Sequence, residues 1–241
     1  MCKAFVGTSG WNYPHWSDGV FYPSGLSQNK WLEYYARFFN SVELNVTFYR
    51  LVHKKTFEGW YKRTSKEFYF AVKGWRFITH IKKLKIVDKS LRLFFDSAYE
   101  LREKLAVVLW QFPAGFKKDI DRLEVFLKLL KKTKVAQAFE FRNESWFNND
   151  VYNLLKEYNA CLCVAHSDYF PCVREITTDF LYLRFHGRET LYNYNYSDKE
   201  LKEWAEFAKN SKVKEVFTFF NNDAHGYAVK NALKFKELLG G

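Results

Sequence analysis

Residues 41–47 alternate strictly between apolar and polar side chains, which is the pattern of an extended strand. The apolar side is Val42, Leu44 and Val46, and the polar side is Glu43, Asn45 and Thr47. Such a strand can lie at a surface with its polar side in water. It can also lie in a closed barrel, where the polar side faces the barrel axis. Because a buried carboxylate costs several kcal/mol unless it is paired, the second arrangement is expected mainly where a site is built.

Eight short segments of the chain are apolar or alternating runs of strand length. They are residues 4–9, 41–47, 69–74, 105–112, 137–142, 161–167, 180–187 and 216–222. Between them, apolar residues recur at helical spacing. The predicted helices are residues 27–39, 56–62, 90–104, 119–132, 149–158, 198–209 and 224–239, with Ser27 and Ser90 as possible N-caps.

This alternation of strands and helices predicts parallel βα units. Eight units in 241 residues fit a single (β/α)8 barrel of the TIM type, an α/β fold with eight parallel strands and outer helices in one domain over residues 1–241. An open, doubly wound sheet is an alternative, but the turn after the first strand, Gly7-Thr8-Ser9-Gly10-Trp11, lacks the dinucleotide-binding fingerprint. Two smaller α/β domains are a further alternative, although no change of composition marks a boundary.

Polar side chains recur near the C-terminal end of most predicted strands. They are Lys73, Gln111, Glu140, Arg142, Arg184 and His186, the run His166-Ser167-Asp168 and the run Asn221-Asn222-Asp223. In barrels of this type that end carries the active site. One such residue is ordinary, but seven strands with such residues, when the polar side of strand 41–47 is included, predict a functional pocket.

Glu43 and Glu140 are the candidates for general acid and base, if their environments separate their pKa values. They can instead form interior salt bridges with Lys73, Arg142 or Arg184. Paired carboxylates also suit glycoside cleavage, at a separation that a sequence does not give. The position of His186 at a strand end makes it a further acid/base candidate, with His80 and His166 as weaker ones.

A metal site is a less favoured hypothesis, and the cofactor is unassigned. Glu43, Glu140, Asp168 and His186 are possible ligands of a divalent metal by type. No local spacing such as His-Glu-x-x-His supports a metal site, so none of these residues is assigned as a ligand.

Anion binding has more support. The run from Asn221 to Gly226 ends the last strand and opens the last helix, where barrels often bind phosphate, and the run from His186 to Arg188 comes from the preceding strand. Asp223 can instead cap the helix.

The first βα connection is rich in aromatic residues, which suit either a stacking wall for a ring or a lid packed on the barrel mouth. These residues are Trp11, Tyr13, Trp16, Phe21 and Tyr22.

The formal net charge of +11 fits an anionic small molecule, a phosphate group or nucleic acid as partner, or only a lysine-rich solvated surface.

No apolar run is long enough to span a bilayer, and the first residues have no signal-peptide layout, so a cytoplasmic protein without a membrane partner is expected. Cys161 and Cys163 lack zinc-finger spacing and are expected to be buried thiols. The oligomeric state is left open.

Ordered motifs along the chain resemble those of a known family. They are Gly7-Thr8-Ser9-Gly10-Trp11, Phe21-Tyr22-Pro23, Tyr34-Tyr35-Ala36, Val42-Glu43-Leu44-Asn45-Val46-Thr47-Phe48-Tyr49, Phe70-Ala71-Val72-Lys73, Thr79-His80, Gln111-Phe112-Pro113, Glu140-Phe141-Arg142, Ser145-Trp146, Arg184-Phe185-His186-Gly187 and Phe220-Asn221-Asn222. Together they span essentially the whole chain and resemble the YecE-like family, domain of unknown function 72. The resemblance implies a TIM-type barrel and supplies no activity.

The resemblance also implies which residues are functional. They are Glu43, Asn45, Lys73, His80, Gln111, Glu140, Arg142, Arg184, His186 and Asn222. The family pattern has an aspartate soon after the sixth strand. Here the run His166-Ser167-Asp168 leaves its register open, so Asp168 is a weak assignment.

The leading hypothesis is an enzyme that binds a polar, anionic small molecule at the barrel mouth. Glu43 or Glu140 would act as acid or base, and Lys73, Arg142 and Arg184 would neutralise charge. The alternatives are a protein that binds nucleic acid or processes phosphodiesters, and a non-catalytic ligand-binding protein.

Overall fold

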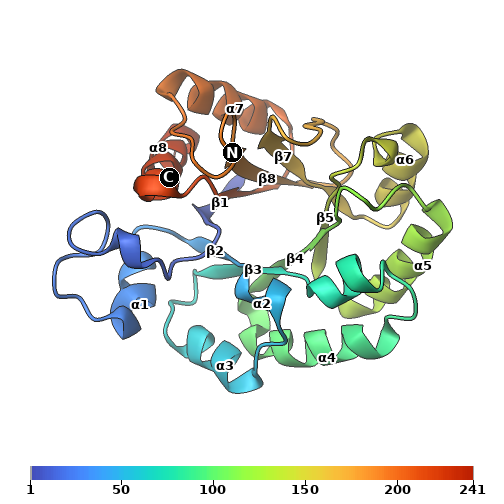
Figure 1. Ribbon diagram of the computed structural model, residues 1–241, viewed down its shortest axis with the longest axis horizontal. Helices are drawn as coiled ribbons and strands as arrows, with labels where there is room; N and C mark the ends of the chain where they lie inside the picture. The colour runs from blue at the N-terminus through green and yellow to red at the C-terminus, as the bar shows by residue number, and fades with distance from the viewer. Residues whose placement is uncertain (1, 241) are drawn as a thin grey trace.

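The computed structural model describes residues 2–240 and contains nine parallel strands in two sheets (Figure 1). The strands are β1 (Lys3–Thr8), β2 (Ser41–Leu44), β3 (Tyr69–Lys73), β4 (Leu105–Gln111), β5 (Ala136–Glu140), β6 (Cys161–Leu162), β7 (Val164–Ser167), β8 (Phe180–Gly187) and β9 (Glu215–Phe220). One sheet has the order β1-β9-β8-β7 and the other β2-β3-β4-β5-β6. Parallel strands joined through helices give an α/β fold, as predicted.

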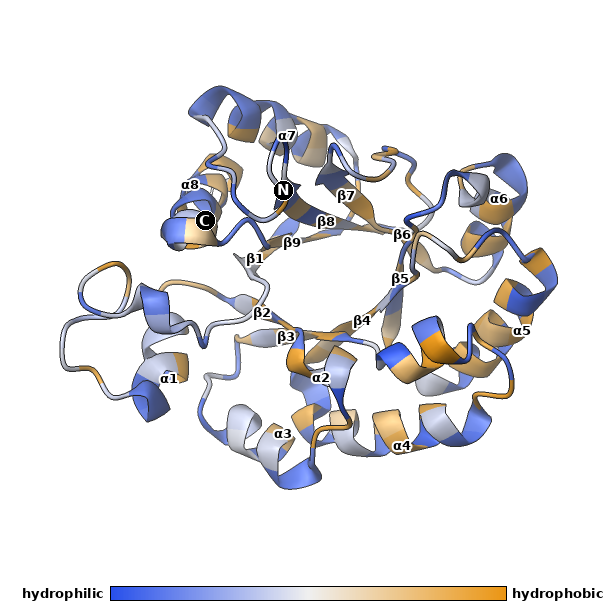
Figure 2. Ribbon diagram, viewed as in Figure 1, coloured by the Kyte–Doolittle hydropathy of each residue, from blue (hydrophilic) through white to orange (hydrophobic). Residues whose placement is uncertain are grey.

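The helices lie around the outside of the strands (Figure 1). They are α1 (Trp31–Tyr35), α2 (Val46–Tyr49), α3 (Lys54–Lys62), α4 (Asp88–Ala98), α5 (Ile120–Leu130), α6 (Asn149–Glu157), α7 (Asp198–Asn210) and α8 (Tyr227–Leu239). Short 3-10 turns span Pro14–Trp16, Gln28–Lys30, Tyr99–Lys104, Lys131–Thr133, Glu144–Trp146 and Ala224–Gly226, and a π turn spans Phe77–Ile81. Figure 2 shows polar residues gathered on the outer faces of the helices.

Alternating strand residues pack into two separate apolar clusters. On β2, Val42 and Leu44 belong to the large cluster beneath the helices, while Glu43 between them points the other way. On β3, Ala71 belongs to the smaller cluster inside the strands. Lys73 shares its parity and therefore faces the interior too. This sorting confirms the strand parity that the sequence predicts.

The predicted strand 41–47 is wrong in its second half. The strand ends at Leu44, and Asn45 has helical backbone angles and precedes α2. The single proton of the Thr47 hydroxyl is shared between the carbonyl oxygens of Leu44 (2.8 Å) and Lys73 (2.6 Å). These contacts hold the helical turn against the end of β3. The alternating pattern of residues 41–47 does not indicate this turn.

The predicted strand 161–167 is divided into β6 and β7, so residues 2–240 form nine strands and not eight. The division falls at Cys163, whose N–H donates to the Phe139 carbonyl oxygen (2.8 Å). β6 pairs with β5 and β7 pairs with β8, so this short segment lies in both sheets. The apolar side chains of residues 161–167 do not indicate that the pairing strand changes from β5 to β8.

The other junction between the sheets lies between β1 and β2, where side chains replace a backbone ladder. Asn40 Oδ1 accepts from the Val6 N–H (3.0 Å), and Asn40 Nδ2 donates to the Ala4 carbonyl oxygen (2.8 Å). A Cβ at Gly7 would lie 2.0 Å from the Ser41 carbonyl oxygen, so only glycine permits this approach.

Two predicted helix starts are corrected. The α-helical part of the predicted helix 27–39 is only α1, and Ser27 makes no side-chain cap bond to the 3-10 turn that precedes it. α4 begins at Asp88 with Val87 as N-cap, so Ser90 lies inside the helix. No helix among residues 2–240 is both long enough and apolar enough to cross a membrane.

Candidate functional site

A buried arginine joins the two sheets in the interior. Arg184 on β8 donates through Nη2 to Glu43 Oε1 on β2 (2.7 Å) and through Nη1 to Glu140 Oε2 on β5. All three side chains are fully buried. Glu43 also accepts from the Ser9 hydroxyl (2.8 Å) and the Tyr182 hydroxyl (2.7 Å). The sequence-predicted residues Glu43, Glu140 and Arg184 therefore meet, as an ion-pair network.

This network keeps both carboxylates ionised. Burial alone would raise the pKa of Glu43, but Arg184, followed by Lys73, holds it below its ordinary value. Burial also opposes ionisation of Glu140, and the guanidinium groups of Arg184 and Arg142 hold the pKa of that carboxyl well below its ordinary value. A carboxylate in this state is a poor proton carrier at neutral pH.

His186 is buried next to the network and is neutral at pH 7. Burial, and then Arg184, lowers the pKa of His186 to about 4. Its Nδ1 accepts from Asn221 Nδ2 (3.1 Å), which assigns the ring proton to Nε2. That Nε2 lies 3.5 Å from Glu140 Oε2 and has no hydrogen-bond partner among residues 2–240. A buried donor without a partner is expected beside a ligand or a water.

Lys73, the last residue of β3, is a nearly buried cation without a counter-ion. Only 8% of the residue is exposed, and Nζ lies 4.3 Å from the centre of the Phe48 ring. Within the described chain, Nζ forms neither an ion pair nor a hydrogen bond, because Arg184 and Arg142 occupy the nearby carboxylates. Burial, and then Arg184, lowers the pKa of Lys73 to about 7, although Glu140 and Glu43 oppose this.

Lys73 lies at the wall of a cavity of about 420 Å³. The cavity is lined by Tyr13, His15, Asn45, Tyr49, Lys73, Tyr192, Asn221, Asp223 and Ala224. Asn45 donates from Nδ2 to the Ser9 carbonyl oxygen (3.2 Å), while its buried Oδ1 has no partner among the residues described. Tyr13 donates to the same carbonyl oxygen (2.6 Å). The sequence-predicted residues Tyr13, Asn45, Lys73 and Asn221 therefore share one cavity.

Asp223 also belongs to this cavity, which corrects its interpretation as a helix cap. It makes no side-chain cap bond to the turn that follows. Its carboxylate accepts instead from Trp16 Nε1 (2.8 Å) and lies 2.9 Å from His15 Nε2. Burial raises the pKa of Asp223 to about 6, although the bonds from Trp16 and His15 oppose the rise. The cavity thus holds a lysine and an aspartate that both titrate near neutrality.

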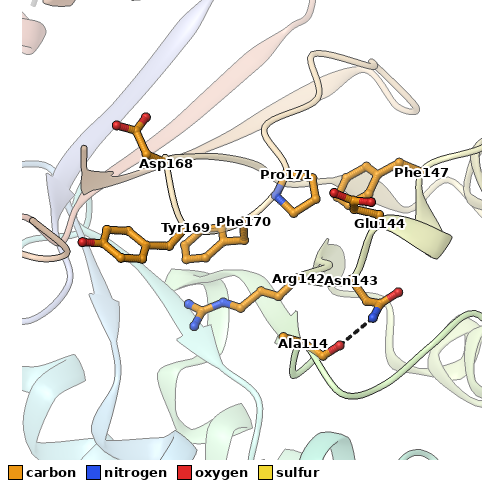
Figure 3. Close-up of a pocket in the computed structure, with 9 residues that line it drawn as sticks. All are labelled: Ala114, Arg142, Asn143, Glu144, Phe147, Asp168, Tyr169, Phe170 and Pro171. Carbon is orange, nitrogen blue, oxygen red and sulfur yellow. Dashed lines mark hydrogen bonds between the residues drawn. The ribbon is translucent and has the colours of Figure 1, made fainter. Parts of the chain in front are cut away.

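A second cavity, of about 560 Å³, lies beside Arg142 (Figure 3). Arg142 donates from Nε to Glu140 Oε1 (2.7 Å), and its guanidinium carbon lies 4.5 Å from the centre of the Phe170 ring. Its terminal nitrogens have no partner within residues 2–240, and the side chain is 19% exposed. A fixed guanidinium with free donors at a cavity wall suits a carboxylate or a phosphate.

His80 and Gln111 lie close to each other near the end of β4. His80 Nδ1 lies 2.8 Å from the Thr79 hydroxyl, and Nε2 lies 3.5 Å from Gln111 Nε2. Burial, and then Lys73, lowers the pKa of His80 to about 4. His80 is therefore a neutral ring whose pKa is affected by the charge of Lys73.

Three other candidates do not line the cavity at Lys73. Asn222 donates to the Tyr194 carbonyl oxygen (2.7 Å) and to Asn231 of α8 (2.8 Å), so it fastens β9 to a helix. Trp11 packs edge-on against Trp60 at 5.6 Å between ring centres. Asp168 lines the second cavity and pairs with the exposed Arg188 (3.3 Å). Their predicted ligand roles gain no support from these positions.

The possible metal ligands Glu43, Glu140, Asp168 and His186 do not form a metal cluster. Among residues 2–240, no group of three or more His, Cys, Asp or Glu side chains is arranged to hold a metal ion. Glu43 and Glu140 are already bonded to Arg184, and Asp168 points elsewhere to Arg188.

Sequence reasoning did not select His15, Tyr49, Tyr192 or the catalytic potential of Asp223. Asp223 stood in a polar run at a strand end, which was a usable signal. His15 and Tyr192 come from connecting segments before α1 and after β8, where no periodicity indicates the direction of a side chain. Only the fold brings His15 and Tyr192 to the cavity that Lys73 lines.

Comparisons with known proteins identify relatives over the whole chain. The sequence pattern of a family described as "Protein of unknown function DUF72" matches residues 5–241. The chain is 31% identical over 271 residues to UPF0759 protein YunF of Bacillus subtilis (strain 168), with 98% of this chain and 94% of YunF covered.

Solved structures agree with this match. The fold resembles a DUF72 family protein from Thermotoga maritima MSB8 with a TM-score of 0.88 and 34% identity, covering 99% of this chain and 100% of the other. It also resembles D-psicose 3-epimerase with a TM-score of 0.58, covering 99% and 100% of the two chains. At 8% identity, that second likeness concerns the fold alone.

Proposed function

The chain belongs to the DUF72 family, whose description names no reaction, and we propose that it is an enzyme acting on a polar, anionic small molecule by proton transfer. The observation that carries the proposal is Lys73, a nearly buried cation with no counter-ion at the wall of a cavity. A lysine kept in this state costs stability, and such a cost is expected where the group does chemistry.

Lys73 and Asp223 are the proposed acid and base. Their pKa values of about 7 and about 6 are shifted towards each other from opposite sides. At neutral pH, Lys73 is then present in both protonation states, and Asp223 is mostly ionised while remaining easy to protonate. Groups that titrate near the working pH transfer protons most effectively.

Glu43 and Glu140 have a different part in this proposal. Both are fully buried and bonded to Arg184, which keeps them charged. Their negative charge opposes the loss of positive charge from Lys73 and balances the two interior arginines. We therefore assign proton transfer to Lys73 and Asp223, and charge balance to the two glutamates that the sequence favoured.

Anion recognition is proposed for Arg142. Its Nε is fixed by Glu140 and its plane by Phe170, while the terminal nitrogens remain available at the cavity wall. A pre-positioned guanidinium loses little side-chain entropy when it binds a carboxylate or phosphate in two-point contact.

We also propose that the two sheets close into one (β/α)8 barrel, with the split strand β6–β7 counted once. The support is the covalent continuity at Cys163 on one side and the bonds of Asn40 across β1 and β2 on the other. The interior contact of Arg184 with both sheets fits the same arrangement. That residues 1–241 form a single domain stays a prediction.

The test is a thermal-shift screen of carboxylated and phosphorylated metabolites, followed by product analysis of each stabilising compound. For a compound that is turned over, Lys73→Met and Asp223→Asn are each expected to lower kcat by about 10²-fold or more, because each removes a proton carrier. Lys62→Met is the matched control, since that lysine is exposed on α3.

Full turnover by both variants would contradict the assignment of Lys73 and Asp223. Stabilisation by a ligand without any product, across every compound that binds, would favour the non-catalytic alternative.

A second candidate function is single-stranded nucleic-acid binding, which one surface segment favours. Trp75 and Phe77 are stacked at 4.7 Å between ring centres, directly after β3. Exposed basic residues follow or flank them, namely Arg76, Lys82, Lys83, Lys85 and Lys89. Aromatic rings among basic side chains are typical of surfaces that bind single strands.

This second candidate predicts that oligonucleotide affinity falls linearly with salt on a logarithmic scale. Fluorescence anisotropy with labelled single-stranded RNA and DNA, between about 50 and 200 mM salt, measures the slope. An affinity that does not change with salt, or that is unchanged when Lys82, Lys83 and Lys85 are replaced by serine, would contradict nucleic-acid binding at this segment.

A further inference from the structure

The surroundings of Lys73 suit bond formation as well as proton transfer. Its Nζ meets the face of Phe48 on α2 at 4.3 Å and shares a cavity with Asn45 and Asp223. The buried Asn45 Oδ1 has no hydrogen-bond partner among the described residues. The cavity thus offers an amine, an acceptor without a donor, and a carboxyl group around one space.

We propose that Lys73 is a nucleophile that condenses with the carbonyl carbon of a small anionic aldehyde or ketone to form a Schiff base. This inference rests on the proposed function, because it takes the same cavity as the reaction site. It adds a covalent step and a substrate class, a carbonyl compound that carries a carboxylate or a phosphate.

The step balances without an oxidant or a reductant. The neutral Lys73 amine attacks the carbonyl carbon, and the carbonyl π electrons move to oxygen, which takes a proton from the carboxylic-acid form of Asp223. The nitrogen then loses a proton to the Asp223 carboxylate, leaving a carbinolamine. Asp223, which then carries a proton again, gives it to the carbinolamine hydroxyl. Water leaves as the nitrogen lone pair forms the C=N bond, so that one positive charge stays on nitrogen.

The charges that face Lys73 favour both the neutral amine that attacks and the cationic imine that forms. Arg184 from β8 and Arg142 after β5 favour the neutral amine that attacks, and Glu43 from β2 and Glu140 from β5 favour the cationic product. The Phe48 face also attracts a cation at this position. At a pKa of about 7, half of the amine is neutral at pH 7, against about one part in 2500 for an ordinary lysine.

Two further groups suit the substrate. Asn45 Oδ1 can accept a hydrogen bond from the carbinolamine hydroxyl or from a hydroxyl next to the carbonyl. Arg142 lines the second cavity, and its charge reaches Lys73, so an anionic group of the substrate that extends towards that cavity would meet its free guanidinium nitrogens. A cavity of about 420 Å³ fits a small substrate.

The test traps the imine on the full-length protein. Glyoxylate and sodium cyanoborohydride are added at pH 7, and modified lysines are mapped by peptide mass spectrometry. Lys73 is expected to be modified about tenfold or more faster than the exposed Lys62, because its neutral fraction is far larger. Its rate is expected to rise with pH through a midpoint near 7.

Modification of Lys62 without modification of Lys73 between pH 6 and 9 would overturn the Schiff base. Lys73→Arg, which keeps a cation, should lose only the adduct at that position. The wild-type peptide map alone decides the matter if this variant does not fold.

The outcomes separate the two proposals. Loss of turnover in Lys73→Met with no trapped adduct leaves proton transfer standing and removes the Schiff base. A trapped adduct with full turnover in Lys73→Met removes Lys73 from the proposed proton transfer and from catalysis through a Schiff base, and leaves only a reactive lysine.

Discussion

At the scale of single residues, Arg184 governs the charge of the interior. It is fully buried and bonds two fully buried carboxylates, Glu43 and Glu140. Its charge also helps to lower the pKa of Lys73 and of His186. Burial is the larger cause of the lowered pKa values of Lys73 and His186, and the Arg184 guanidinium adds to it while it keeps the two glutamates ionised.

Removal of this guanidinium should be costly. Arg184→Met is expected to lower the free energy of unfolding by about 3–5 kcal/mol at pH 7, because two carboxylates remain buried without a partner. Urea unfolding followed by circular dichroism measures it. Arg188→Met, which breaks an exposed pair with Asp168, is the control and should cost about 0–1 kcal/mol.

The pH dependence of this difference has a definite sign. The pKa values of Glu43 and Glu140 are lowered by folding, so their contribution to stability is present above the unfolded value, about 4.3. It is lost as pH falls through the folded values. The gap between Arg184→Met and wild type should therefore shrink below about pH 4, and a constant gap would contradict the ion-pair account.

At the scale of elements, the change from β2 to α2 forms one wall of the reaction cavity. β2 stops at Leu44, and the helical turn brings Phe48 over Lys73 and Asn45 into the cavity. The bonds from Thr47 to the Leu44 and Lys73 carbonyl oxygens tie the two elements together. The position of Lys73 thus depends on a residue outside the cavity.

Thr47→Val is expected to lower the free energy of unfolding by about 1–3 kcal/mol, because the carbonyl oxygens of Leu44 and Lys73 lose the hydroxyl proton that they share. Chemical denaturation measures this. Thr190→Val is the matched control, since Thr190 is exposed and its hydroxyl makes no hydrogen bond within the described chain. Equal stability of the two variants would show that the bonds from Thr47 contribute nothing.

Strand parity was enough to predict most of the interior. The apolar neighbours of Glu43, Lys73 and Arg184 fix the face on which each lies, because a strand alternates with a period of two. Parity fails where the backbone leaves the strand, as at Asn45. Parity gives no distances, so interior salt bridges of Glu43 and Glu140 with Arg184 were named only as an alternative to acid/base roles. The contact of Asp223 with His15 was not predicted.

At the scale of the whole molecule, the sheets meet at two junctions that the sequence did not indicate. One is the change of partner at Cys163, and the other is the pair of hydrogen bonds from Asn40 to β1. Both depend on which segments lie side by side, which local patterns do not encode. The alternation of strands and helices was predictable because each βα unit is local in the chain, whereas the predicted count of eight strands was wrong for residues 2–240.

Asn40→Ala tests the second junction. Loss of both side-chain bonds is expected to lower the free energy of unfolding by about 1–3 kcal/mol and to speed hydrogen exchange at the Val6 amide, which loses its acceptor. Asn210→Ala, at the exposed end of α7, is the control. Unchanged exchange at Val6 would contradict the bridge between β1 and β2.

The central claim is that Lys73 loses its proton near neutral pH because it is buried beside Arg184 without a counter-ion. The most direct measurement is a pH titration of its ¹³Cε resonance in protein labelled with ¹³C-lysine, assigned by comparison with Lys73→Arg. A midpoint at about pH 7 is the predicted result. A midpoint near 10.4, the ordinary value for lysine, would contradict the claim and with it both proposals for this residue.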